Sequence, residues 1–159
     1  MVHETAIGKV GAGICWDQWF PEAARAMVLM GAEILIYPTA IGSEPAFAGW
    51  DSRDHWQRVM QGHAGANLTP LIAANRVGVE KGASCDVIYY GSSFIADHTG
   101  AKLAEADRVT DGIITASLDF AAIDLARRSW GVFRDRRTDL YSNLAQRTPE
   151  MLMPSSAPA

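Results

Sequence analysis

A cysteine at the junction between a strand and a helix is the feature that most constrains how this chain can fold. Residues 7–14 have the apolar, glycine-containing pattern of a short strand, and Pro21 suits the first turn of a helix. Cys15 is therefore predicted to lie where a strand ends, at the sheet edge where open α/β folds build their sites. Two interpretations stay open at this point: a nucleophilic thiol, or a buried cysteine acting as a small apolar side chain.

Two apolar runs further along the chain have the character of strands that are buried on both faces. They cover residues 34–37 and 71–75, and Pro38 is predicted to end the first. The spacing of apolar side chains predicts helices that begin at Pro21 and at Arg53, the second ending at Asn67. This alternation of strands and helices predicts right-handed crossovers and a parallel core, which is an α/β fold.

The second half of the chain has a different texture. Its glycines predict an irregular connection after Arg76, followed by short strands at 93–96, 102–105 and 112–118 with mixed pairing. Asp119 is predicted to cap a helix that ends near Arg128. Residues 148–159 are rich in proline and serine and are predicted to be a disordered tail, so that residues 1–147 form part of a single domain.

Composition and charge exclude several classes of function. The formal net charge of −4 argues against nucleic acid as a partner. Cys15 and Cys85 are far apart, which gives neither a disulfide framework nor the spacing of a metal site. The start of the chain lacks the pattern of a signal peptide, and no apolar run is long enough to cross a membrane. A reducing cytoplasm suits a free thiol, so we expect a cytoplasmic protein with no membrane partner.

The motif around the cysteine carries a family resemblance. It reads G-I-C-W-D-Q-W-F-P-E-A-A-R, from Gly13 to Arg25, and resembles the nucleophile motif of the nitrilase (carbon–nitrogen hydrolase) superfamily. Three further stretches, 37–45, 55–67 and 129–137, resemble the N-carbamoylputrescine amidohydrolases within it. The likeness runs from about Gly8 to Tyr141 and implies the C-terminal half of a nitrilase-like four-layer αββα sandwich.

The resemblance also implies a set of roles. Cys15 is expected to be the nucleophile of an amidohydrolase, and the backbone N–H of Trp16 an oxyanion donor. Glu44 is the candidate for pairing with the distal ammonium group of N-carbamoylputrescine, the alternative being a solvated loop residue. The resemblance implies no metal or organic cofactor.

Two groups that the family uses are missing from the pattern. Family members combine the cysteine with a glutamate and a lysine that precede it, whereas here only Glu4 and Lys9 stand before Cys15, in no matching motif. The chain is therefore predicted to be inactive alone and to associate with a complementary N-terminal half or as a homo-oligomer. The alternative is a non-catalytic fragment or pseudo-subunit that docks another chain.

Other polar residues receive weaker interpretations. Asp17 and Gln18 are predicted to order the turn around the cysteine rather than to react. His55 and His63 share one side of the predicted helix and offer a Cys–His pair as the second-choice chemistry. The arginine-rich run 127–137 favours a subunit interface or an ion-pair network, and Cys85 has no predicted role.

Overall fold

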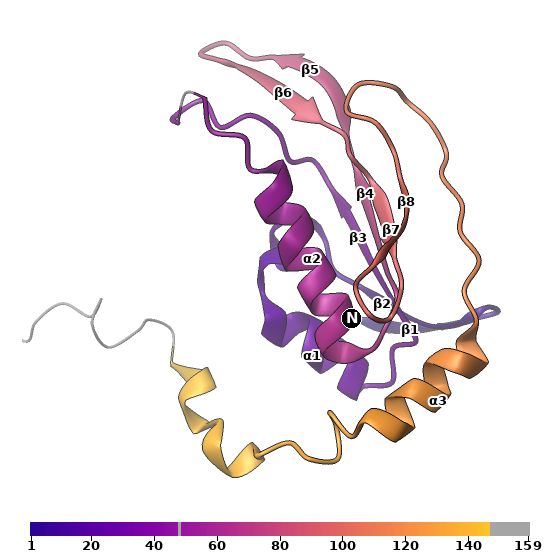
Figure 1. Cartoon of the computed structure of the whole chain (residues 1–159). Helices are drawn as coiled ribbons and strands as arrows, with labels where there is room; N and C mark the ends of the chain where they lie inside the picture. Colours follow the sequence, from indigo (N-terminus) through magenta and orange to yellow (C-terminus); the bar gives the residue numbers. More distant parts are fainter. Residues whose placement is uncertain (48, 147–159) are drawn as a thin grey trace, which may run out of the picture.

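A computed structural model describes residues 1–47 and 49–146 of the chain. Its main feature is a six-stranded sheet with the strand order β1-β2-β3-β4-β7-β8 (Figure 1). These strands are β1 (Val2–Thr5), β2 (Gly8–Ala12), β3 (Ile34–Thr39), β4 (Leu71–Asn75), β7 (Phe94–Ala96) and β8 (Lys102–Glu105). The remaining two, β5 (Val77–Lys81) and β6 (Asp86–Tyr90), form a separate hairpin.

The centre of the sheet is parallel and its edges are antiparallel. Parallel pairing joins β2 to β3 and β3 to β4, while β1, β7 and β8 each run antiparallel to a neighbour. The crossovers contain α1 (Pro21–Leu29) and α2 (Arg53–Asn67), which lie on one side of the sheet (Figure 1). Successive right-handed crossovers in one direction place their helices on the same face. The predicted α/β class, parallel core and bounds of the second helix are confirmed.

The face of the sheet toward α1 and α2 is closed. Leu35 and Tyr37 of β3 and Leu71 of β4 point to it and are fully buried. Trp56 and Met60 of α2 pack into the same core and are also fully buried. Most of the apolar burial that stabilises this chain is therefore on this one face.

The opposite face of the same strands is open. Because side chains alternate along a strand, Ile34, Ile36 and Ile72 point away from the helices. All three are partly exposed, whereas their neighbours in the sequence on β3 and β4 are buried. Both α1 and α2 pack on the other face, so neither of these helices covers this one. That a second sheet covers it stays a prediction.

Pro38 does not end its strand as predicted. It lies inside β3 and pairs with Ala74 of β4. The backbone groups of Ile36 face β2, because its carbonyl accepts from the Gly13 N–H, so those of Pro38 face the same side. The ladder with β2 has already ended at Ala12, so the missing N–H of Pro38 leaves no ladder partner unsatisfied.

Two predictions for the second half were also wrong. The connection after Arg76 is a regular hairpin, β5–β6, whose strands pair from Val77–Tyr90 to Lys81–Asp86. The glycines in this segment were interpreted as loop signals, so the alternation of side chains along the two strands was missed. Residues 112–118 form no strand, and Ile113 is 94% exposed. These residues pair with no described strand, and apolar alternation without such pairing does not make a strand.

The helix after Asp119 is close to its prediction. This helix, α3, spans Phe120–Trp130, and the Asp119 carboxylate accepts a hydrogen bond from the Ala122 N–H at 3.0 Å. Two short 3-10 turns follow, η2 (Thr138–Leu140) and η3 (Ser142–Ala145). The predicted tail 148–159 lies outside the described residues.

Candidate active site

Cys15 lies at the carboxyl end of β2, at the first residue of the 3-10 turn η1 (Cys15–Trp19). Its φ is +49°, in a left-handed region that costs a non-glycine residue roughly 1–3 kcal/mol. Gly13 lets the chain reach this turn, because a Cβ there would lie 2.7 Å from the Tyr37 ring. Strain of this kind gathers at functional sites, which favours the nucleophile interpretation over a packed thiol.

Asp17 fixes the path of the turn, as predicted. Its carboxylate accepts from the Ile14 N–H at 2.9 Å, and its own N–H donates to the Ile14 carbonyl at 3.1 Å. Both bonds close the loop in front of the cysteine. The Asp17 carboxylate is therefore engaged in a backbone hydrogen bond that shapes the turn, which does not favour a direct role as a base.

Gln18 anchors the turn from beneath. Its side chain is buried, accepts from the Trp56 indole N–H at 2.7 Å and donates to the Thr39 hydroxyl at 3.0 Å. The Thr39 hydroxyl in turn lies 3.6 Å from Cys15 Sγ. Sequence reasoning gave Gln18 its structural role, but it missed Thr39, whose one signal is its place at the end of a parallel strand beside β2.

The two histidines support the turn and are not bonded to the thiol. The His63 ring donates from Nε2 to the Gln18 carbonyl at 2.9 Å, and the His55 ring packs on Trp19 with centroids 5.1 Å apart. The side-chain hydrogen bond of Cys15 in the described part of the chain comes from Thr39 instead. The Cys–His alternative is therefore not favoured by the geometry.

The groups beneath the turn carry no charge at neutral pH. Burial lowers the pKa of His63, so the ring is neutral there. Burial, with a smaller contribution from the carboxylate of Asp17, raises the pKa of Tyr37 to about 12. The His63 ring and the Tyr37 phenol beneath the turn are thus both uncharged at neutral pH.

Trp16 offers the predicted oxyanion donor. It is the second residue of η1, where a backbone N–H has no acceptor inside the turn. Its side chain is 70% exposed and meets Trp19 edge-on, with ring centroids 6.4 Å apart. The position of the Trp16 N–H suits it to bind a developing oxyanion, and that role stays a prediction.

Glu44 lies on the loop that leaves the same sheet edge, five residues after Thr39. Its side chain is exposed, and its backbone carbonyl accepts from the Phe47 N–H at 2.9 Å. Asn75, a residue that sequence reasoning missed, clamps the start of this loop: its side chain exchanges two hydrogen bonds with the backbone of Ile41. The loop is thus anchored beside β4, and the role of Glu44 remains to be tested.

Glu4 and Lys9 do not join the site. They face each other across β1 and β2 and form an exposed ion pair at 3.1 Å. Lys9 lies near the start of β2, and the strand carries the chain roughly 10 Å further before it reaches Ala12. Neither residue is placed to act on a substrate at Cys15.

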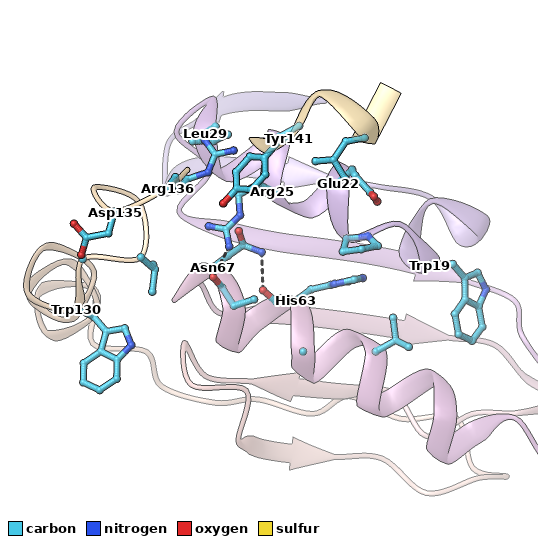
Figure 2. Close-up of a pocket in the computed structure, with 18 of the residues that line it drawn as sticks. Trp19, Glu22, Arg25, Leu29, His63, Asn67, Trp130, Asp135, Arg136 and Tyr141 are labelled. Carbon is cyan, nitrogen blue, oxygen red and sulfur yellow. Dashed lines mark hydrogen bonds between the residues drawn. The ribbon is translucent and has the colours of Figure 1, made fainter. Parts of the chain in front are cut away.

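A large hollow lies apart from the cysteine. It has a volume of about 1280 Å³ and is bounded by Trp19 of η1, by α1 and α2, and by Trp130 with the segment after α3 (Figure 2). Cys15 is not among the residues that line it. Residues drawn around it in Figure 2 include Glu22, Arg25, Leu29, His63, Asn67, Trp130, Asp135, Arg136 and Tyr141. The hollow therefore marks the outer surface of the two helices and not the reactive centre.

The arginine run borders this hollow. Arg25 and Arg127 lie over the Phe133 ring, at 4.8 and 5.6 Å from its centroid. The ion pairs of the run are local ones: Arg128–Asp124, Arg134–Asp135 and Arg137–Asp139. The predicted network is therefore a set of separate exposed pairs, and the predicted interface stays a prediction.

Comparison with known proteins agrees with this geometry. Residues 1–128 match the family model described as carbon-nitrogen hydrolase. The chain belongs to the carbon–nitrogen hydrolase family. The superfamily predicted from the cysteine motif is thereby confirmed.

Three known proteins illustrate what this chain is similar to. A citrullinase from Francisella tularensis is 60% identical over 146 residues, which cover 92% of this chain and 51% of that protein. An N-carbamoylputrescine amidase from Arabidopsis thaliana is 60% identical over 148 residues, covering 90% of this chain and 49% of that protein. A crystal structure of a carbon-nitrogen hydrolase from Helicobacter pylori is 42% identical with a TM-score of 0.86, covering 93% of this chain and 53% of that one.

The chain thus spans about half the length of the relatives that it matches. No helix among the described residues is long and apolar enough to cross a membrane.

Proposed function

We propose that this chain provides the nucleophile of a hydrolase that cleaves a ureido compound, with N-carbamoylputrescine as the substrate. The observation that carries the proposal is Cys15 at a strained turn after β2, with a hydroxyl in contact with its sulfur. The relatives support the substrate class, because their names assign them citrulline and N-carbamoylputrescine. Both compounds carry a terminal ureido group, so the carbonyl that is attacked is chemically the same.

In the proposed reaction, Cys15 Sγ attacks the ureido carbonyl carbon. The oxyanion that forms takes a hydrogen bond from the Trp16 N–H, and ammonia leaves as the carbonyl re-forms on sulfur. Water then attacks this carbonyl and releases the thiol and a carbamic acid. The carbamic acid breaks down to putrescine and carbon dioxide, so one water is consumed in all.

Glu44 is proposed to hold the far end of the substrate. Putrescine ends in a primary ammonium group, and an exposed carboxylate on the loop after β3 is suited to pair with it. The loop is anchored by Asn75 and by the backbone of Ser43, which donates to the Ile88 carbonyl at 2.8 Å. An anchored backbone restricts the positions that this carboxylate can reach.

A complementary N-terminal half is proposed to supply the base and the second oxyanion donor. Glu4 and Lys9 pair with each other at the far end of β2, so they do not fill those roles. Groups that act as a unit lose most of the rate when one of them is missing. We therefore expect the chain to bind its substrate carbonyl but to hydrolyse it very slowly when it is alone.

Complementation tests the proposal. The chain is purified alone and together with the unmatched half of the Arabidopsis relative, and ammonia release from N-carbamoylputrescine is measured. The pair should approach the rate of about 1 per second or more that is common for enzymes, and the isolated chain should stay far below it. Cys15→Ala should abolish the gain, whereas Cys85→Ala, in the exposed hairpin turn, should keep it. A pair that binds but releases no ammonia would favour the non-catalytic pseudo-subunit.

A further inference from the structure

A chain of hydrogen bonds runs from the core of the protein to the cysteine sulfur. It begins at Trp56 on α2, passes through Gln18 on η1 and Thr39 at the end of β3, and ends at Cys15 Sγ. The partners in each of the three hydrogen bonds are 21 to 38 positions apart in sequence, and only the fold brings them together. The chemistry of each member fixes which way its hydrogens point.

The direction is set at the Trp56 end. An indole N–H is a donor only, so the Gln18 oxygen must face Trp56. Trp56 and Gln18 are 0% and 1% exposed, which leaves no water to satisfy an amide turned the other way. The Gln18 amide nitrogen therefore faces Thr39, and it donates to the Thr39 oxygen at 3.0 Å.

The Thr39 hydroxyl is then left with one proton to give. Gln18 occupies a lone pair of its oxygen, so the hydrogen points elsewhere. Among the described residues, the acceptor in hydrogen-bonding range is Cys15 Sγ, at 3.6 Å. A hydroxyl held in this orientation stabilises a thiolate more than a neutral thiol, because a hydrogen bond to a charged acceptor is the stronger of the two.

We infer that Thr39 is a positioning residue for the nucleophile: its hydroxyl, oriented by Gln18 and Trp56, donates to Cys15 Sγ and favours the thiolate. The inference rests on the proposed role of Cys15 as the attacking group. It assigns a task to the strand β3 that the cysteine motif itself does not contain. It also explains why a buried amide and a buried indole are paired beneath an enzyme's turn rather than replaced by apolar side chains.

Thiol alkylation measures this without any substrate. The full chain is treated with iodoacetamide over a range of pH, and the modification of Cys15 and Cys85 is followed in the same tube by peptide mass spectrometry. Cys85 is exposed on the β5–β6 turn and serves as the internal control. Neither the missing glutamate and lysine nor turnover enters the readout, so failure here is distinct from failure of the proposed hydrolysis.

Other titratable groups lie around the turn and are unchanged by substitution of Thr39. They are Asp17 on η1, Tyr37 on β3, Glu22 on α1, and His55 and His63 on α2. A displacement of the profile in a Thr39 variant is therefore assigned to the hydroxyl.

Thr39→Val, which keeps the shape and removes the hydroxyl, should move the pH profile of Cys15 alkylation upward by about one unit, a change of about tenfold in rate at neutral pH. The Cys85 profile should not move. Thr39→Ser should stay near the parent profile, and Thr39→Ala provides a second hydroxyl-free variant if valine is poorly accommodated. An unmoved Cys15 profile in the hydroxyl-free variants, or a serine variant displaced as far as the valine one, would overturn the inference.

Discussion

The two faces of the central sheet differ in how completely this chain fills them. On one face Leu35 and Tyr37 are fully buried under α1 and α2. On the other face their neighbours Ile34 and Ile36 are partly exposed. Adjacent residues of one strand thus point alternately to a closed face and to an open face of the sheet.

Cys15 lies at the carboxyl end of β2, beside both faces of the sheet. Buried groups on the closed face support its turn from beneath: the amide of Gln18, the indole of Trp56 and the ring of His63. The turn is therefore supported by groups that this chain itself supplies. The comparison teaches that the turn around Cys15 is built on the closed face of the sheet, so its shape should not depend on what covers the open face.

The first prediction tests the comparison through stability. Leu35→Ala should lower the free energy of unfolding by about 2–5 kcal/mol, because it opens a cavity in a packed core. Ile36→Ala, one residue later on the open face, should lower it by about 1 kcal/mol or less, since its side chain is only partly removed from water. Urea denaturation of both variants at low protein concentration measures the difference, and equal losses would mean that the two faces are equally covered.

The second prediction reverses the roles of the two faces. We expect the parent chain to self-associate or to bind a complementary half through its open face, as exposed apolar sheets do. Ile36→Lys should weaken that association about a hundredfold or more, because an unpaired charge is costly to bury in an interface. Analytical ultracentrifugation over a concentration series gives the constant. A parent chain that stays monomeric, with no affinity for the complementary half, would show that the face is satisfied in another way.

The third prediction concerns the loop above the site. In the completed enzyme, Glu44→Gln should weaken use of N-carbamoylputrescine tenfold to a hundredfold, since a hydrogen bond to a charged group is worth about 1.5–3 kcal/mol. An analogue without the distal amine should lose little. Glu4→Gln, in β1 and away from the site, is the matched control. Equal losses for both substrates would give Glu44 a role in loop structure instead.

The smallest expected effect is on how the free energy of unfolding depends on pH, through His63 on the closed face. Burial lowers the pKa of His63, so the unfolded chain binds this proton more tightly than the folded one. The stability due to neutral His63 is therefore complete above its ordinary pKa of about 6.5 and is lost as the pH falls below it.

His63→Gln keeps a donor for the Gln18 carbonyl but does not titrate there. It should flatten the fall in stability below pH 6.5, by at most about 1.4 kcal/mol per pH unit for one proton. Denaturation curves at a series of pH values provide the test. Parallel slopes for the parent and the variant would remove His63 from this account.

Local patterns predicted the elements well where one chain segment contains the whole signal. The helix α2 begins at Arg53 and ends at Asn67 as its apolar spacing indicates, and Asp119 caps α3. The cysteine was placed correctly because strand, turn and helix signals follow one another within fifteen residues. Signals of this kind depend on nearest neighbours along the chain.

The errors arose where the deciding partner lies far away in the sequence. Pro38 is tolerated within β3 because the ladder between β2 and β3 has already ended, and residues 112–118 form no strand because they pair with no described strand. Thr39 was missed for the same reason: its meaning depends on Cys15 and Gln18, more than twenty residues earlier. A local sequence pattern does not contain contacts between residues that are far apart in the chain.

The most direct test of the central claim is a covalent adduct on Cys15. The chain is combined with a complementary half that carries the family's glutamate and lysine, mixed with N-carbamoylputrescine, quenched in acid and digested for mass spectrometry. The account predicts the substrate-derived carbonyl adduct on the peptide that contains Cys15, none on the peptide that contains Cys85, and none in Cys15→Ala. A pair that hydrolyses the substrate while Cys15 stays unmodified, or while Cys15→Ala remains active, would contradict the claim that this turn delivers the nucleophile.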